Sequence, residues 1–101
     1  MSQLVHVDTT SYEHIAIISL NRPAAANAMS LQLLDDLQQA VETVSKHQAI
    51  FCTILTAEGD KAFCAGADLK ERRGMNDHQV LQAVRKIGET VLKVEQMPMP
   101  V

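Results

Sequence analysis

The feature that most constrains the fold is an amphipathic segment at 31–46, followed after three residues by an apolar run at 50–56. Apolar residues recur in the first segment at spacings of three and four, which predicts a helix with one apolar face. They are Leu33, Leu34, Leu37, Val41 and Val44. The run IFCTILT is almost entirely apolar or β-branched, which is typical of a strand buried on both faces. A helix that leads into such a strand predicts helices layered on a sheet, and hence an α/β fold.

Two further strands are expected before this unit, at 4–8 and 13–21. The first segment alternates apolar and polar residues, and the second is rich in isoleucine. The polar stretch 9–12 between them fits a hairpin loop. Pro23 ends the second strand, and Ser30 is a good N-cap for the helix that follows.

A second long helix is expected at 77–96, with Asp77 as its N-cap. Its inner face would carry Val80, Val84, Ile87, Val91 and Val94. A turn with Gly59 available for positive φ precedes the loop that leads to this helix. The predicted order is therefore strand, strand, helix, strand, loop and helix, with a further strand expected to begin at Val101.

Composition excludes several classes of function. The 101 residues carry a formal net charge of −3, with 47% hydrophobic and 21% charged residues, which gives no electrostatic footprint for nucleic acid or an anionic membrane. Two cysteines, Cys52 and Cys64, cannot form a disulfide framework, and no cluster has metal-ligand spacing. The N-terminus does not resemble a signal peptide, and no apolar run approaches the ~20 residues of a membrane span. These observations predict a cytoplasmic protein with reduced thiols.

No side-chain catalyst stands out. The four histidines lie in separate predicted elements, and the serines lack a nucleophile-elbow pattern. No glycine-rich phosphate-binding motif is present. The remaining candidate is a backbone feature in CAGAD, where small side chains leave the amide N–H groups of Ala65, Gly66, Ala67 and Asp68 accessible. Such amides can hold an anion or a developing oxyanion, although residue types alone fit an ordinary tight turn equally well.

Two longer motifs carry a resemblance to a known family. SLNRPAAANAMSLQLLDDL at 19–37 and TILTAEGDKAFCAGADLKE at 53–71 resemble the N-terminal part of the crotonase superfamily, the enoyl-CoA hydratases and isomerases. The closing MPMPV resembles the family's entry into its next core strand. The stretch FCAGADLKER is similar to the methylglutaconyl-CoA hydratase branch, which includes an RNA-binding member. The resemblance implies a crotonase-like spiral of ββα units, of which residues 1–101 would be the N-terminal part, cut at the start of a core strand.

The resemblance also implies a site. Family members bind acyl-CoA thioesters and polarise the thioester carbonyl with two backbone N–H groups, the first of which here is that of Ala67. The substrate-binding positions would be Arg22, Ala25, Ala28, Lys61, Ala65, Gly66, Ala67, Asp68, Leu69 and Lys70. Ala24 stands where the family often has a lysine. No separate cofactor or metal is implied, since CoA is part of the substrate, and the family suggests a homotrimer or a hexamer.

The expected activity is syn hydration of 2-enoyl-CoA in fatty acid metabolism. The family's second amide donor and its acid/base glutamates would lie beyond Val101, so the 101-residue chain alone is expected to be inactive. Enoyl-CoA isomerase, acyl-CoA hydrolase and dehalogenase activities remain alternatives, because those enzymes share this part of the fold. RNA binding is a further alternative, but the stretch 37–49 that carries several lysines in the RNA-binding relative has one here, Lys46. A last alternative is an independent interaction protein, which would expose a strand edge and the apolar faces of two helices.

Overall fold

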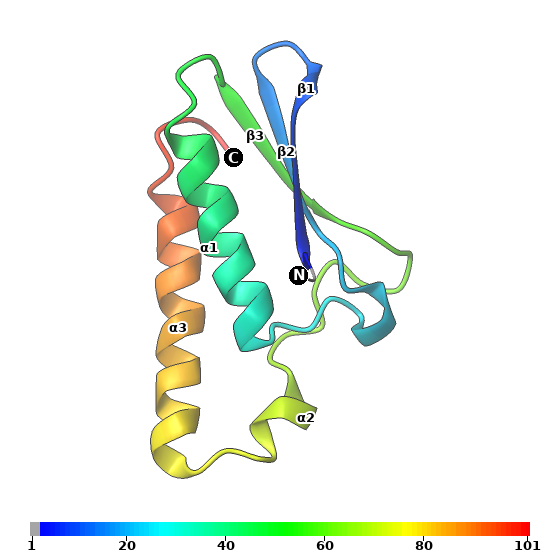
Figure 1. Cartoon of the computed structure of the whole chain (residues 1–101), viewed down its shortest axis with the longest axis vertical. Helices are drawn as coiled ribbons and strands as arrows, with labels where there is room; N and C mark the ends of the chain where they lie inside the picture. Colours follow the sequence, from blue (N-terminus) through cyan, green and yellow to red (C-terminus); the bar gives the residue numbers. More distant parts are fainter. Residues whose placement is uncertain (1–2) are drawn as a thin grey trace.

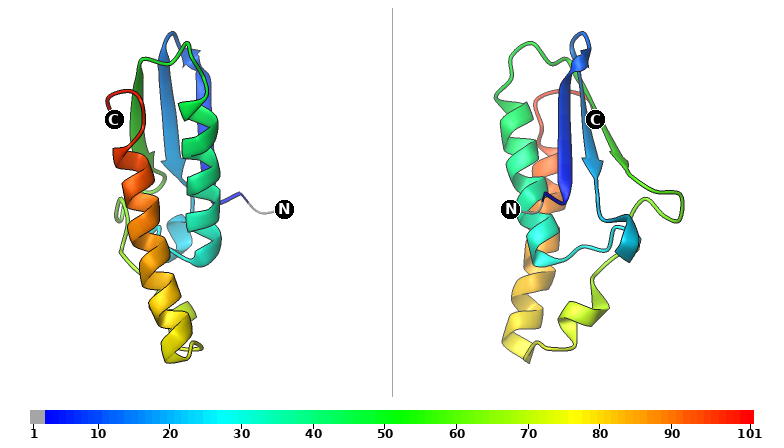
Figure 2. Two further views of the ribbon diagram at one scale, coloured as in Figure 1. Left: turned by 90° about the vertical axis from the view of Figure 1, so that its left-hand side faces the viewer. Right: turned by 45° about the vertical axis from the view of Figure 1, so that its right-hand side comes forward.

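The computed structural model describes residues 3–101 and contains a three-stranded sheet with two long helices on one side (Figures 1 and 2). The elements in chain order are β1 (Val5–Tyr12), β2 (Ile15–Leu20), the 3₁₀ turn η1 (Pro23–Ala25), α1 (Leu31–Ser45), β3 (Cys52–Ala57), α2 (Leu69–Arg72) and α3 (Asp77–Glu95). The predicted α/β class is confirmed. Within residues 3–101, no helix is long and apolar enough to cross a membrane.

The sheet has the order β1-β2-β3, with β1 antiparallel and β3 parallel to β2. The parallel pair runs from Ile15 opposite Cys52 to Leu20 opposite Ala57, and α1 forms the connection between the two strands. The predicted hairpin loop at 9–12 is wrong, because β1 continues to Tyr12. An irregularity in the β1–β2 pairing after Asp8 accommodates this length. The Asp8 carboxylate accepts the amides of the second and third residues after it, which supports the local kink.

Helix α1 follows the prediction closely. The Ser30 hydroxyl accepts the amide of Leu33 at 3.1 Å and so caps the helix. All five predicted inner residues are buried, together with Ala40. All of them except Leu34 pack against the side chains that β1 and β2 direct toward the helix, including Val5, Ala16 and Ile18. Full burial of each large apolar side chain stabilises the fold by about 1.5–3 kcal/mol, so this layer is the main source of stability.

Helix α3 departs from the prediction in its cap and in its buried face. Asn76, not Asp77, is the N-cap, because Asn76 and Gln79 exchange side-chain and backbone hydrogen bonds in a capping box. Of the inner face that was predicted, Val84 and Val91 are exposed by 48% and 58%. The other three residues, Val80, Ile87 and Val94, are half-buried. The buried residues are instead Ala83 and Thr90. The reason is that α3 packs mainly on α1 and has little of the sheet beneath it.

The contact between α1 and α3 includes polar groups. The Thr90 hydroxyl accepts from Gln38 Nε2 at 2.8 Å and donates to the carbonyl of Lys86 at 2.7 Å. The Lys86 ammonium group pairs with the carboxylate of Asp35. These bonds fix the relative positions of the two helices where apolar packing is sparse.

Strand β3 is not buried on both faces as predicted. Burial alternates along it, with Thr53 1% exposed and its neighbour Ile54 47% exposed. The helices cover one face of the sheet, so alternate side chains of this edge strand point away from them (Figure 2). The C-terminal segment returns to this edge, where the Thr53 amide donates to the carbonyl of Pro100 at 2.9 Å.

The pattern of exposed apolar residues is uneven. Helix α3 exposes Leu81, Val84, Val91 and Leu92, and β3 exposes Ile54. The apolar face of α1, by contrast, is covered. The expectation of exposed apolar helix surface therefore holds for α3 and is wrong for α1. Strand β3 is an edge strand, but the C-terminal segment pairs with it at Thr53.

Candidate functional site

Two segments far apart in sequence lie side by side at one end of the sheet: residues 21–30, which precede α1, and residues 58–68, which follow β3 (Figure 1). Backbone hydrogen bonds join them. The amide of Ala65 donates to the carbonyl of Ala26 at 3.0 Å, and that of Met29 donates to the carbonyl of Gly66 at 2.8 Å. The predicted substrate-binding residues all lie on these two segments or on the first turn of α2.

The backbone of Ala67 is held in a short parallel bridge with Met29. The Met29 amide bonds to the residue before Ala67, and the Met29 carbonyl accepts the amide of Asp68 at 3.4 Å. In such a bridge the N–H and C=O of the central residue point away from the partner segment. Among the hydrogen bonds of residues 3–101, the amides of Gly66 and Ala67 donate to no protein acceptor. The expectation of four accessible amides is therefore half right, since those of Ala65 and Asp68 are used by the fold.

An ion pair fixes the end of this loop. Arg22 Nη1 lies 2.8 Å from Asp68 Oδ2 and also donates to the carbonyl of Ala28 at 3.1 Å. Asp68 caps α2 by accepting the amide of Glu71 at 3.1 Å. The hydrogen bond from Arg22, followed by that from the Glu71 amide, lowers the pKa of the Asp68 carboxyl below its ordinary value. The charges of these two predicted substrate-binding residues are thus paired with each other.

The turn at 58–62 carries Lys61, whose side chain is exposed. Gly59 has a φ of +88°, as predicted, and a Cβ at this position would lie 2.9 Å from the Cβ of Pro23. The turn therefore needs glycine both for its conformation and for its close approach to the other segment. Between the two segments lies a hollow of about 160 Å³, lined by Pro23, Ala26, Asn27 and the turn residues Glu58, Gly59, Asp60, Lys61 and Ala62.

Asn27 lies within the Ala25–Ala28 segment that the family resemblance places at the CoA site, but the sequence reasoning did not single it out. Its side chain is fully buried between the two segments and hydrogen-bonds to both. An asparagine inside a run of alanines was a signal that could have drawn attention to it, because alanine would suffice if only close packing were required. The two carbonyls that accept from its side-chain nitrogen, however, lie 31 and 35 residues away in sequence.

Comparison with known proteins identifies the family. The model of the enoyl-CoA hydratase/isomerase family matches residues 10–101. The chain belongs to this family. It is 47% identical over 93 residues to the enoyl-CoA hydratase/isomerase YngF of Bacillus subtilis, a match that covers 92% of this chain and 36% of YngF. The crotonase resemblance stated above is thereby confirmed.

Solved structures of enoyl-CoA hydratases share the fold. The enzyme from Bacillus anthracis superposes with a TM-score of 0.93 at 48% identity, over 98% of this chain and 38% of that enzyme. An enoyl-CoA hydratase from Mycobacterium smegmatis gives a TM-score of 0.90 at 32% identity, over 99% of this chain and 38% of that protein. The chain therefore spans less than two-fifths of the length of these relatives and corresponds to their N-terminal portion.

The methylglutaconyl-CoA hydratase branch is a more distant relative. The mouse mitochondrial methylglutaconyl-CoA hydratase is 35% identical over 86 residues, which covers 85% of this chain and 27% of that enzyme. This identity is lower than that to YngF. The similarity to that branch therefore runs along most of this enoyl-CoA hydratase/isomerase family member but is distant.

An apolar hollow of about 170 Å³ adjoins the amide-bearing loop of this family member. It lies between α1, α3 and the end of β3, and its walls include Phe63 and Cys64, which directly precede the CAGAD amides. Met29, the bridge partner of Ala67, also lines it. The other lining residues are Leu20, Leu33, Leu34, Leu37, Leu55, Ile87, Thr90, Val91 and Val94. The site thus combines unpaired amides, an apolar hollow and, on the neighbouring turn, an exposed ammonium group.

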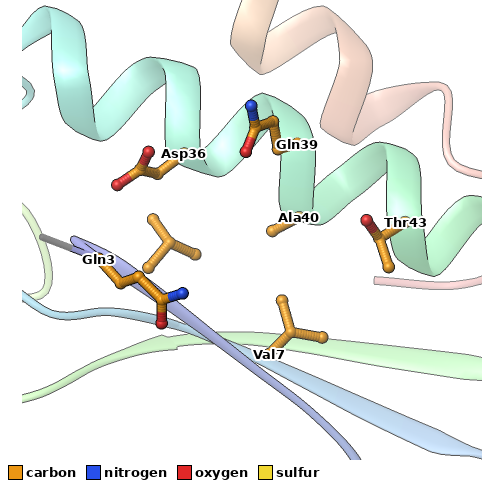
Figure 3. A pocket seen from close by; sticks show the side chains of 7 residues that line it. Gln3, Val7, Asp36, Gln39, Ala40 and Thr43 are labelled. Carbon is orange, nitrogen blue, oxygen red and sulfur yellow. The ribbon is translucent and has the colours of Figure 1, made fainter. Parts of the chain in front are cut away.

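Another hollow, of about 340 Å³, lies between β1 and α1 (Figure 3). None of the predicted substrate-binding residues lines it. Its carboxylate, Asp36, accepts hydrogen bonds from the amide of Leu4 at 2.9 Å and from Gln32 Nε2 at 2.7 Å. Because the carboxylate is already used in this way to join β1 to α1, the hollow offers no chemistry comparable with that of the loop pair.

Proposed function

We propose that this chain is the N-terminal part of an enoyl-CoA hydratase, which adds water to the double bond of a 2-enoyl-CoA thioester. The observation that carries the proposal is the amide N–H of Ala67. It is unpaired among residues 3–101, and hydrogen bonds on both sides hold it in place. When water adds to the double bond of a 2-enoyl thioester, negative charge develops on the oxygen of the thioester carbonyl, because the double bond is conjugated with it. A fixed amide stabilises that charge without reorganisation in the transition state.

The neighbouring features suit the two ends of such a substrate. Lys61 is the cation of the 58–62 turn and would contact CoA phosphate groups. Ala25, Ala28 and Ala65 would let the CoA portion approach the backbone, with Leu69 and Lys70 continuing the same wall. The apolar hollow beside Phe63 and Cys64 would take the acyl chain.

The remaining machinery is proposed to lie outside residues 1–101. The second oxyanion donor and the acid/base glutamates would come from the part of the fold that the chain does not span. Glu71 is used by the fold of this chain, since its Oε1 accepts the amide of Leu31 at 3.0 Å. The complete enzyme is this chain joined at its C-terminus to the remaining part of the fold. That part is either the natural continuation of this protein or the corresponding segment of the Bacillus anthracis relative. The complete enzyme is proposed to be a homotrimer or a hexamer, and the 101-residue chain alone to be inactive.

The test is hydration of 2-enoyl-CoA by the complete enzyme and by an Ala67→Pro variant, with Ala67→Ser as the control that keeps the N–H group. Loss of one oxyanion donor lowers kcat by about 10²–10³-fold. The proline variant should show this loss while still binding the thioester, and the serine variant should retain most of the activity. Normal kcat in the proline variant would exclude the proposed role of Ala67.

Isomerisation of enoyl-CoA is the second candidate, because relatives named as hydratase/isomerase match this chain. The same amide would stabilise the enolate formed in that reaction. Assays of the same protein with 2-enoyl-CoA and water, and with 3-enoyl-CoA, distinguish the two reactions. Turnover of the 3-enoyl thioester without hydration would replace the hydratase proposal by the isomerase.

A further inference from the structure

Asn27 makes an unusual set of contacts for a residue with no assigned chemistry. Its side chain is 0% exposed, and its backbone is in the left-handed region with a φ of 58°. Asparagine tolerates this conformation better than most residues with a side chain. A fully buried polar side chain is retained at little cost only when its hydrogen-bonding groups are satisfied.

Every hydrogen of the Asn27 side-chain amide is used. Nδ2 donates to the carbonyl of Glu58 at 2.9 Å and to the carbonyl of Ala62 at 3.1 Å. Oδ1 accepts the amide of Arg22 at 2.8 Å, while the Asn27 amide donates to the Arg22 carbonyl at 2.9 Å. Asn27 therefore closes its own segment into a rigid loop and, from that loop, holds the neighbouring turn.

The two carbonyls that Asn27 holds lie at opposite ends of the 58–62 turn. Among the hydrogen bonds of residues 3–101, those from Asn27 are the ones that join this turn to segment 22–28. Lys61 lies between the two carbonyls in sequence, and both Asn27 and Lys61 line the hollow of about 160 Å³. Asn27 thus constrains the Lys61 backbone, together with the bond from the Glu58 amide to the carbonyl of Leu20 at 2.7 Å at the start of the turn.

The Ala67 loop is held differently. The amide of Ala65 and the carbonyl of Gly66 bond to the backbone of Ala26 and Met29, without the Asn27 side chain. Changing that side chain should therefore move the Lys61 turn more than the amide donor of Ala67.

We infer that Asn27 is a positioning residue for CoA recognition: its side-chain amide fixes the Lys61 turn against the segment that carries Ala25 and Ala28. This inference rests on the proposed function, because it takes the CoA portion of an acyl-CoA thioester as the ligand of the turn. Asn27 acts through Lys61 and does not itself touch the reacting atoms.

The test uses the complete enzyme with two variants of Asn27. Asn27→Asp keeps the size and the Oδ1 acceptor but removes both donors, and Asn27→Gly keeps the left-handed backbone but removes the whole side chain. Asn76→Asp is the matched control, since Asn76 caps α3 through its oxygen and aspartate caps equally well. Each protein is assayed with an acyl-CoA and with the corresponding acyl-pantetheine, which lacks the adenosine and phosphate groups.

Both Asn27 variants should raise KM for the acyl-CoA by about tenfold and change kcat by less than about threefold. KM for the acyl-pantetheine should be unchanged. In a Lys61→Gln background, Asn27→Asp should add little to the increase in KM, since the two residues act as one unit. The Asn76→Asp control should match the parent protein with both substrates.

Three results would overturn the inference. Equal losses with acyl-CoA and acyl-pantetheine would assign Asn27 to the Ala67 loop or to the fold as a whole. Failure of both variants to fold would assign it to folding alone. Full additivity with Lys61→Gln would show that it acts independently of the turn. Absence of turnover in the parent protein would instead count against the proposed function, and binding of CoA alone to the same variants would then test the inference.

Discussion

The layer of α1 on the sheet and the pair of loops at 21–30 and 58–68 are held by different interactions. In the layer, apolar side chains such as Leu33 and Val44 are fully buried, and their contribution depends on area and not on direction. In the loops, one buried amide, one ion pair and a short bridge fix the backbone at named atoms. Burial supplies most of the stability, whereas directional bonds set the positions of the groups proposed to bind substrate. Substitutions in the two regions should therefore have separable effects.

The largest effect on stability is expected in the layer. Leu33→Ala removes a fully buried side chain and should lower the free energy of unfolding of this chain by about 2–5 kcal/mol in urea. Leu81→Ala is the matched control on α3, where the side chain is 48% exposed, and should cost less than about 1 kcal/mol. If both variants lost the same free energy of unfolding, the difference in burial between α1 and α3 would be contradicted.

A smaller effect is expected in the loops. Asp68→Asn keeps the N-cap of α2 but removes the charge that faces Arg22, whose side chain is 28% exposed. The free energy of unfolding should fall by about 1–2 kcal/mol near neutral pH, because one charge-assisted hydrogen bond is weakened. Urea titration measures this loss, and an unchanged midpoint would show that solvent screens the pair.

The same variant gives the pH dependence of the pair. The pKa of Asp68 is lowered in the folded state, so the pair stabilises the fold above the ordinary aspartate pKa of about 3.9. This stabilisation is lost as the pH falls through the lowered value. As the pH falls from 6 through the lowered pKa, the parent chain should therefore lose more stability than Asp68→Asn, so that the difference between the two proteins shrinks. If the free energies of unfolding of the two proteins changed equally with pH, the ion pair between Arg22 and Asp68 would be contradicted.

The smallest effect is expected on α3, outside both regions. Gly88→Ala places a methyl group where no atom lies within 4 Å, and it should stabilise this chain by about 0.5–1 kcal/mol through helix propensity. Thermal unfolding of the two proteins measures the difference. A loss of stability in the complete enzyme, with a gain in this chain, would show that the rest of the fold packs against this face.

The elements that sequence reasoning predicted well are those determined by local pattern. The spacing of apolar residues and the Ser30 cap identified α1, and isoleucines identified β2, because each signal lies within the element itself. The burial of β3 was predicted wrongly and that of α3 only in part correctly, since burial depends on which neighbours cover these elements. The true cap of α3, Asn76, lies one residue before the predicted one.

The candidate site was predictable to a similar degree. Small residues pointed to the CAGAD backbone, where the structure leaves the amides of Gly66 and Ala67 unpaired among residues 3–101, and the family resemblance pointed to Ala67. Which amides remain unpaired could not be read from the sequence, because Ala65 and Asp68 bond to a segment about 40 residues away. The Arg22–Asp68 pair and the contacts of Asn27 are equally long-range, and no local pattern encodes them.

The most direct test of the central claim replaces the amide N–H of Ala67 by an ester oxygen in the complete enzyme. This change removes the hydrogen-bond donor and keeps the side chain, and it also weakens the Gly66 carbonyl as the acceptor of the Met29 amide. The matched control is the same replacement at Gly66, whose amide is also unpaired among residues 3–101. The ester at Ala67 should lower kcat for 2-enoyl-CoA hydration by about 10²–10³-fold with little change in KM, and the ester at Gly66 should leave kcat nearly unaltered. A kcat within about threefold of the parent enzyme for the Ala67 ester would contradict the account.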